Sequence, residues 1–238
     1  MMRFLTLTLR RTAIACIVFI FEGTTQAQDC AYCEANKMLC SEAFDYYKKN
    51  QFFSDYVREN LTLSPAFVFS IVAPEITQYM YLQDKLETMA SKVLYINVGN
   101  DYGNFSLGIF QMKPSFIEDL EKEVKADSAL TSFRFILPDS STSERDKRMI
   151  RIDRLEDENW QIKYLCLFST IIQLKYSKTL FPSESEKLKF FATAYNTGFN
   201  KPESTIRIMQ EKKFFPHFST DKFSYSEISV CFFKELEE

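Results

Sequence analysis

Glu75 is the residue of this chain best suited to acid–base chemistry. It stands alone at the end of an apolar stretch, Ala66 to Ile76. A carboxyl group in apolar surroundings favours its neutral form, so its pKa rises and it can act as a general acid toward a glycosidic oxygen. The alternative interpretation is a Glu that faces solvent at a helix end and has no chemical role.

Two later segments combine hydroxyl and amide side chains with a glycine. Residues 104–114 read Asn-Phe-Ser-Leu-Gly-Ile-Phe-Gln-Met-Lys-Pro, and their serine, Ser106, follows Glu75 by 31 positions. Residues 191–198 read Phe-Ala-Thr-Ala-Tyr-Asn-Thr-Gly. An acid in apolar surroundings, a polar turn with glycine and a helix end of the Ala-Tyr-Asn type together suggest a site that cleaves sugars.

In their residue types and their order, these three segments resemble lytic transglycosylases and goose-type lysozymes. The resemblance covers about residues 64–116 and 188–233. It implies that Glu75 is the catalytic acid and then the base, and that Tyr195 hydrogen-bonds and orients it. The substrate-binding residues that the resemblance implies are Ser106 at the N-acetyl group, Gly108 where the backbone approaches the sugar, Gln111 and Met112 along the cleft, and Asn196 at its floor.

The reaction that the resemblance implies uses one carboxylate. Glu75 would protonate the bridging oxygen between N-acetylmuramic acid and N-acetylglucosamine in a peptidoglycan strand, while the substrate's own N-acetyl group stabilises the developing charge. The carboxylate would then deprotonate the muramyl 6-hydroxyl and give a 1,6-anhydro product. The resemblance implies no metal and no cofactor.

The chain departs from the family pattern at several positions. Ser106 lies much further from the acid than in typical members, Ile76 stands where a serine usually follows the acid, and Lys113 replaces an apolar residue. Asp101 precedes the glycine loop as in goose-type lysozymes. It is either a second acid that positions water, which would make the enzyme a hydrolase, or a turn residue beside Gly103.

The remaining pattern predicts an all-α fold of the lysozyme-like kind, with a small β element at most near residues 97–110. Only 5 glycines occur, which favours helices. Ser64 and Pro65 are typical of a helix start, and we expect a central buried helix that ends at Glu75 because Pro74 precedes it. Further helices are predicted at 78–96, from Pro114 to about 127, from Met149 to Tyr176, from Ser183 or Ser185 to Asn196, and at 224–233, with an exposed loop at 139–148.

Residues 1–27 are typical of a cleaved signal peptide, with three arginines, a short apolar run and a small-residue site ending at Ala27. A membrane anchor is the alternative, although the run is about half the ~20 residues that a spanning helix needs. We therefore expect a periplasmic or secreted protein, divided into a helical, cysteine-containing segment at 28–60 and a lysozyme-like domain at 61–238, with no transmembrane segment in the mature chain. Removing three Arg and one Glu changes the charge from −3 to −5, which argues against a nucleic-acid partner.

The cysteines that remain after residue 27 are Cys30, Cys33, Cys40, Cys166 and Cys231. Export permits disulfides, and an odd number leaves at least one thiol unpaired within the chain. Cys30 or Cys33 could pair with Cys40 as a structural staple. A redox or zinc motif is the alternative for Cys30 and Cys33, but the only histidine is His217, which we interpret as a packed or surface residue.

The sequence thus predicts an exported enzyme that acts on peptidoglycan strands as a lyase, with a lysozyme-type hydrolase as second choice. A different class of function is a non-catalytic, lysozyme-like scaffold that binds glycan or assembles with an envelope or secretion protein. A third is a secreted helical adaptor unrelated to lysozymes. Geometry separates them, because an enzyme requires Glu75, Ser106 and Gln111 in one groove, whereas the adaptor predicts that the three segments lie far apart.

Overall fold

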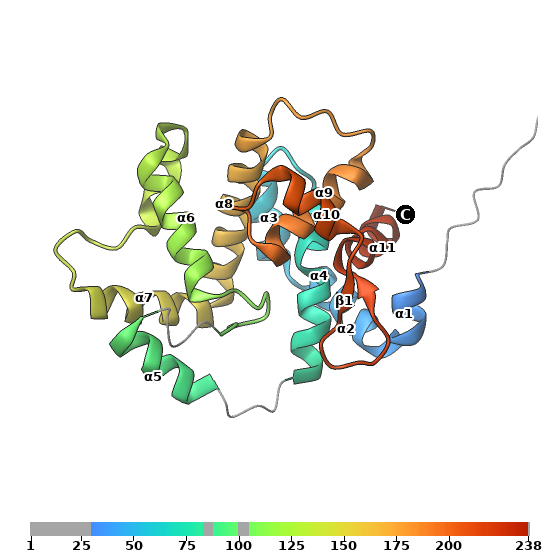
Figure 1. The fold of residues 1–238 in the computed structure, drawn as a ribbon, viewed down its shortest axis with the longest axis horizontal. Helices are drawn as coiled ribbons and strands as arrows, with labels where there is room; N and C mark the ends of the chain where they lie inside the picture. Colours follow the sequence, from blue (N-terminus) through green and yellow to red (C-terminus); the bar gives the residue numbers. More distant parts are fainter. Residues whose placement is uncertain (1–29, 83–87, 100–104, 238) are drawn as a thin grey trace, which may run out of the picture.

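A computed structural model describes residues 30–82, 88–99 and 105–237 of the chain. The predicted signal peptide and Asp101 lie outside these residues. Helices dominate the described residues, as the sequence predicts, and the sheet found among them has only two strands (Figure 1). None of the helices in these ranges combines the length and the apolar character needed to cross a lipid bilayer.

In chain order the elements are α1 (Ala31–Ala35), α2 (Lys37–Lys49), α3 (Gln51–Asn60), α4 (Pro65–Leu82), α5 (Thr88–Val98), α6 (Pro114–Ala126), the 3₁₀ helix η1 (Ser128–Ile136), α7 (Glu144–Glu156), α8 (Glu158–Lys175), α9 (Glu184–Thr197), α10 (Glu203–Gln210), β1 (Lys213–Phe215), β2 (Phe223–Ser224) and α11 (Tyr225–Glu237). The strands β1 and β2 pair antiparallel.

Helix α4 is the central helix of the fold. Its start agrees with the prediction, since the Ser64 hydroxyl accepts a hydrogen bond from the Phe67 amide at 3.1 Å and Pro65 occupies the first position. The helix is apolar on all sides and packs against α2, α3, α8, α9 and α11. A helix surrounded in this way draws its stability from burial rather than from an amphipathic face.

The prediction that α4 ends at Glu75 is wrong, because the helix continues through Pro74 to Leu82. A proline inside a helix removes one hydrogen bond and costs about 3 kcal/mol. Burial of Ile76 and Thr77 on the far side of Pro74 offsets this cost. The Thr77 hydroxyl also donates to the Pro74 carbonyl at 2.7 Å and meets the Tyr32 hydroxyl at 2.6 Å. The carboxyl of Glu75 therefore projects from the middle of a buried helix.

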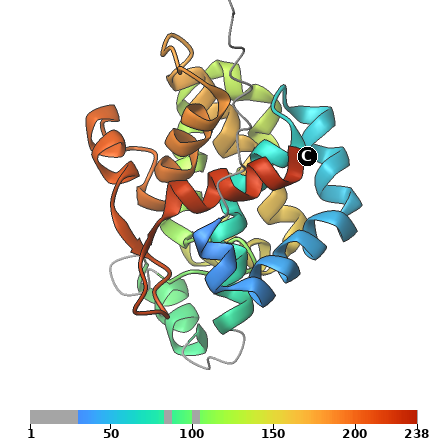
Figure 2. The ribbon, with the colours of Figure 1, turned by 90° about the vertical axis from the view of Figure 1, so that its right-hand side faces the viewer.

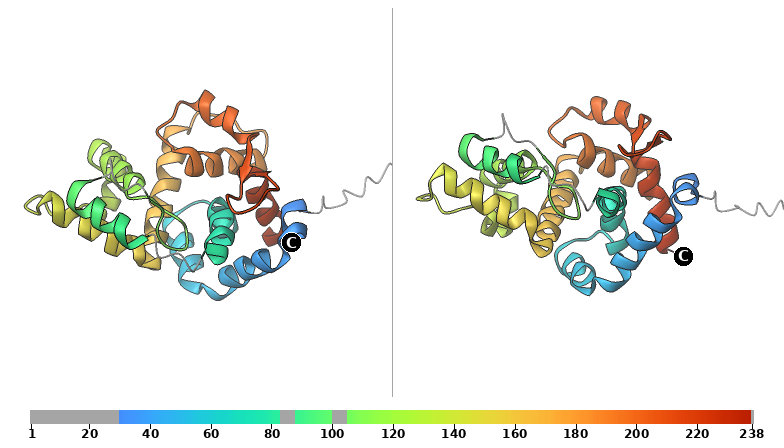
Figure 3. Two further views of the ribbon diagram at one scale, coloured as in Figure 1. Left: turned by 60° about the horizontal axis from the view of Figure 1, so that its bottom comes forward. Right: turned by 90° about the horizontal axis from the view of Figure 1, so that it is seen from below.

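Two groups of helices lie on either side of α4 and α8. Helices α5, α6 and α7 lie on one side, whereas α9, α10 and α11 lie on the other (Figure 3). Residues 105–113 pass between the two groups and lead into α6 (Figure 3). Helix α11 packs across α4 and α9, next to the N-terminal helices (Figure 2).

Two disulfides hold the N-terminal segment. Cys33 pairs with Cys40, one of the predicted staples, across a separation of 7 residues. Cys30 pairs with Cys231 in α11, across a separation of 201 residues, a partner that the sequence did not suggest. Cys166 is a free thiol buried in α8.

Several predictions about the elements are wrong. Residues 78–82 of the helix expected at 78–96 belong to α4, and residues 144–148 of the loop expected at 139–148 belong to α7. The expected helix from Met149 to Tyr176 is two helices, because the Asp157 carboxylate accepts a hydrogen bond from the Trp160 amide at 3.1 Å and thereby starts α8. The expected β element near residues 97–110 is reduced, in its described part, to a single bridge between Leu107 and Met112. The strands lie instead between α10 and α11.

Candidate active site

Glu75 lines a cleft, and the residue is only 7% exposed. Burial raises its pKa from 4.5 to about 7, against the opposing effects of a hydrogen bond from Asn196, the charge of Lys113 and a hydrogen bond from Tyr225. The Asn196 amide donates to Oε1 of Glu75 at 3.3 Å. A carboxyl with such a pKa exchanges its proton near neutral pH, which general acid–base catalysis requires.

The cleft has a volume of about 580 Å³ and brings the three sequence segments together. The predicted site residues that line it are Glu75, Ser106, Gln111, Met112, Tyr195 and Asn196. The cleft is also lined by residues that were not predicted to belong to a site: Gln78, Phe105, Lys113, Ser115, Phe116, Asp119, Thr197, Gly198, Phe199, Phe214 and His217. The adaptor hypothesis predicted that the three segments lie far apart, and that prediction is wrong.

Gly108 supports the cleft from outside and does not line it. The loop closes through two backbone hydrogen bonds between Leu107 and Met112, of 2.8 and 3.0 Å. Gly108 has φ +68°, and a Cβ there would lie 1.7 Å from Nε2 of Gln161. Glycine is therefore required for packing against α8, not for approach to a sugar as predicted. Gln161 also accepts from the Phe110 amide at 2.8 Å, so the loop is fixed to α8.

Tyr195 holds the same loop and does not hydrogen-bond Glu75 as predicted. Its hydroxyl donates to the Phe110 carbonyl at 2.7 Å. Its ring packs edge-on against Phe116 and Phe168, with centroid distances of 5.3 and 5.4 Å. The aromatic packing places the Tyr195 hydroxyl over the loop. The hydrogen bond from α9 to Glu75 comes instead from Asn196 in the last turn of that helix.

Tyr225, which the sequence analysis missed, is the tyrosine that contacts the acid. Its hydroxyl donates to the Ile71 carbonyl at 3.0 Å and lies within hydrogen-bond reach of Glu75. A phenol has one proton, so Tyr225 can donate to the Ile71 carbonyl while Glu75 is neutral and to the carboxylate once Glu75 has ionised. No local pattern marks this role, because Tyr225 reaches Glu75 only through the packing of α11 on α4.

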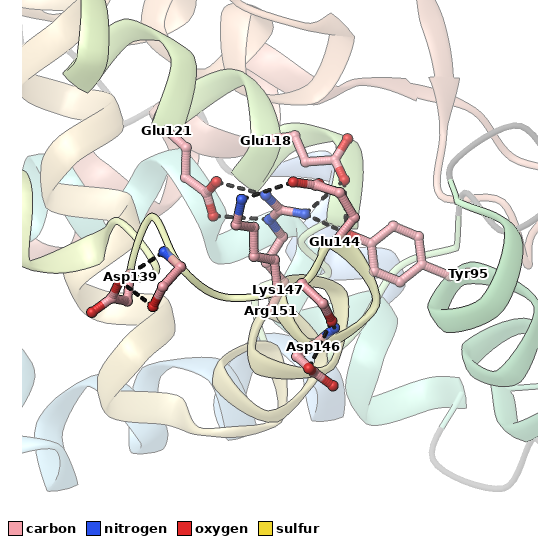
Figure 4. A network of polar contacts seen from close by, with 10 residues as sticks. Tyr95, Glu118, Glu121, Asp139, Glu144, Asp146, Lys147 and Arg151 are labelled. Carbon is pink, nitrogen blue, oxygen red and sulfur yellow. Dashed lines mark hydrogen bonds and ion pairs between the residues drawn. The ribbon is translucent and has the colours of Figure 1, made fainter.

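A buried ion-pair network positions the α6 wall of the cleft (Figure 4). Arg151 in α7 donates to both carboxylate oxygens of Glu121 in α6, at 2.8 and 2.7 Å, and to Glu118 at 3.1 Å. Tyr95 in α5 donates to the same Glu118 at 2.8 Å. A bidentate Arg–carboxylate contact fixes the orientation of the two side chains as well as their distance. Helix α6 is thereby held in a defined position, with Ser115, Phe116 and Asp119 lining the cleft.

The described residues offer no group of three or more His, Cys, Asp or Glu side chains that could hold a metal ion.

The raised pKa of Glu75 predicts a pH-dependent stability that the Glu75→Gln variant lacks. The folded protein keeps this proton up to about pH 7, whereas the unfolded chain loses it near pH 4.5. Stability from this group is complete below pH 4.5 and is lost as the pH rises to about 7. Urea unfolding of both proteins from pH 4.5 to 8 should show the variant gaining up to roughly 3 kcal/mol relative to the parent. A difference that does not change with pH would contradict the assigned environment.

Comparisons of the chain with protein-family models, with curated proteins and with solved structures found no match.

Proposed function

We propose that this protein is a lysozyme-like enzyme that cleaves the β-1,4 bond between N-acetylmuramic acid and N-acetylglucosamine in peptidoglycan. The observation that carries the proposal is the buried carboxyl of Glu75, which lines a cleft of about 580 Å³ and has its pKa raised to about 7. The aromatic walls of the cleft suit sugar rings, and its amides and hydroxyls suit their polar substituents.

In the proposed first step, neutral Glu75 donates its proton to the bridging oxygen as the glycosidic bond breaks. The resulting carboxylate is stabilised by a hydrogen bond from Asn196 and by one from the Tyr225 hydroxyl, which then donates to Glu75 instead of to the Ile71 carbonyl. In the second step the carboxylate takes the proton of the muramyl 6-hydroxyl, whose oxygen closes on the anomeric carbon. The product is a 1,6-anhydro sugar, and Glu75 regains its proton without water or a cofactor.

Hydrolysis of the same bond is the alternative reaction. It would require a second carboxylate, and helix α6 provides one in the wall of the cleft. Asp119 is a second carboxylate in the cleft, on a different helix from Glu75. A second carboxylate can activate water against the far face of the sugar. Asp119 and Asp101 are therefore both candidates for the carboxylate that activates water, and Asp101 lies outside the described residues.

Digestion of purified peptidoglycan followed by mass spectrometry of the products tests the proposal. Anhydro-muramyl ends support the lyase, and reducing muramyl ends would make the protein a lysozyme. If neither forms but the protein still binds glycan strands, the non-catalytic scaffold, with an envelope protein as further partner, replaces the enzyme.

We further propose that the protein acts in the periplasm or outside the cell. Its two disulfides support an oxidising compartment, since such bonds are rare in the cytosol. This location also gives access to peptidoglycan.

The two tyrosines of the site predict different mutant behaviour. Tyr225→Phe removes a hydrogen bond that lowers the pKa of Glu75, so cleavage should fall about 10–100-fold and the pH–rate profile should shift to higher pH. Tyr195→Phe leaves the Phe110 carbonyl without its donor, so it should cost about 1–3 kcal/mol of stability and leave the profile in place. Steady-state rates from pH 5 to 8 and urea unfolding measure both effects. A shifted profile in Tyr195→Phe alone would reverse the two assignments.

A further inference from the structure

Gln78 is a buried amide beside the catalytic acid. It follows Glu75 by one helical turn on α4, so both side chains lie on the same face. Gln78 is only 7% exposed and lines the cleft. Its Oε1 accepts a hydrogen bond from the His217 backbone amide at 3.2 Å, which fixes the orientation of the side chain. Among the described residues nothing accepts a hydrogen bond from its NH₂ group, and Gln78 lines the cleft, where a ligand can reach its side chain.

Lys113 provides a positive charge to the same part of the cleft. Its ammonium lies close enough to lower the pKa of both Glu75 and His217. Within the part of the chain that the structure describes, it forms no ion pair. Lys113 is exposed and lines the cleft, so an anionic ligand in the cleft can reach its ammonium group.

His217 completes the group as a neutral donor. Burial and the charges of Lys222 and Lys113 lower its pKa, so its imidazole is uncharged at neutral pH and carries one N–H. Among the described residues of the cleft walls, the remaining charged one is Asp119, six positions after Lys113 in the chain. That spacing is about 9 Å along α6, so Asp119 faces a different part of a bound saccharide.

We propose that Gln78, Lys113 and His217 form a subsite for the free lactyl carboxylate of a muramyl residue next to the cleaved bond. The inference rests on the proposed function and makes it more specific. An ammonium and two neutral N–H groups match a carboxylate, which accepts hydrogen bonds and carries negative charge. The lactyl carboxylate is free only where the stem peptide has been removed, because the peptide otherwise converts it to a neutral amide. The preferred substrate is therefore a peptide-free glycan strand.

Calorimetric binding to the Glu75→Gln variant tests the subsite without cleavage. Three tetrasaccharides serve as probes: one of N-acetylglucosamine alone, one of alternating N-acetylglucosamine and N-acetylmuramic acid with free lactyl groups, and the same one with stem peptides. We expect the free lactyl form to bind about tenfold more tightly than the other two. Adding Lys113→Met should remove this advantage, whereas adding Lys122→Met, an exposed lysine on α6 outside the cleft, should preserve it.

A second variant tests the amide by itself. Gln78→Glu keeps the shape of the side chain and the acceptor for His217 but replaces the NH₂ donor by a carboxylate oxygen. In the Glu75→Gln background it should also abolish the preference for free lactyl groups, with the thermal unfolding curve checking that the fold is retained.

Each other outcome overturns a defined part of the inference. Equal binding of the free lactyl probe by the Lys113→Met and Lys122→Met variants would refute the subsite, and cleavage of peptidoglycan by the parent protein would then leave the proposed function standing. A Lys113-dependent preference for the peptide-bearing probe would assign the lysine to a stem-peptide carboxylate instead. If the parent neither binds any probe nor cleaves peptidoglycan, the proposed function fails together with the subsite.

Discussion

Glu75→Gln should reduce the rate of peptidoglycan cleavage by a factor of about 10²–10⁴ while leaving the fold intact. The amide can neither donate nor accept the catalytic proton, and general acid–base catalysis contributes on this order. The variant keeps an oxygen that can accept the Asn196 hydrogen bond of 3.3 Å. It also removes a carboxyl whose ionised form is unfavourable in this buried position. Loss of activity therefore cannot come from a weakened fold.

Product formation, followed by chromatography of muropeptides, measures this effect. Glu59→Gln is a suitable control, because Glu59 is exposed on α3 and does not line the cleft. The control should cleave at the parental rate. If Glu75→Gln cleaves at a similar rate, Glu75 is not the acid and another group of the cleft, Asp119 first, must be considered.

Removal of the Cys30–Cys231 disulfide is expected to produce the largest loss of stability. This disulfide closes a loop across 201 residues, whereas Cys33–Cys40 spans only 7. In the chain-entropy model the cost of removing a disulfide grows with the logarithm of loop length, which gives roughly 5 kcal/mol for the long loop and 2–3 kcal/mol for the short one. The double replacement Cys30→Ser with Cys231→Ser should therefore unfold at much lower urea concentration than the parent protein.

The double replacement Cys33→Ser with Cys40→Ser is the matched control, since it removes the same chemistry from the same segment. Serine at position 30 can still cap α1, where the Cys30 sulfur accepts from the Cys33 amide at 3.4 Å. Urea midpoints of the two double variants compare the loops directly. A larger loss in the short-loop variant would mean that local strain, rather than loop length, decides the stability of this segment.

Much of the helical structure was predictable because it depends on local chemistry. Ser64 with Pro65, Lys113 with Pro114, and Ser183 mark the starts of α4, α6 and α9, and the structure has these helices begin where predicted. Capping hydrogen bonds and the fixed φ of proline act within three or four residues, so the chain itself contains the information. The mostly helical class follows from the same signals and the scarcity of glycine.

The end of α4 could not be predicted in the same way. Pro74 favours termination, and only the burial of residues 76–78 by neighbouring helices overrides it. Gln78 was consequently assigned to another helix, and its place beside Glu75 was missed. Propensity is a weak prior wherever tertiary packing contributes more than the few kcal/mol that a proline costs.

By itself, the sequence determined the candidate acid, the segments that meet it and the starts of the helices around them. Only the tertiary structure decided which side chain performs each task. Tyr195 and Tyr225 have the same chemistry, but packing directs one to the Phe110 carbonyl and brings the other to Glu75. Gly108 is required by Gln161, a residue 53 positions later. Contacts between residues far apart in the chain depend on how helices pack, and packing is a property of the assembled core rather than of any segment.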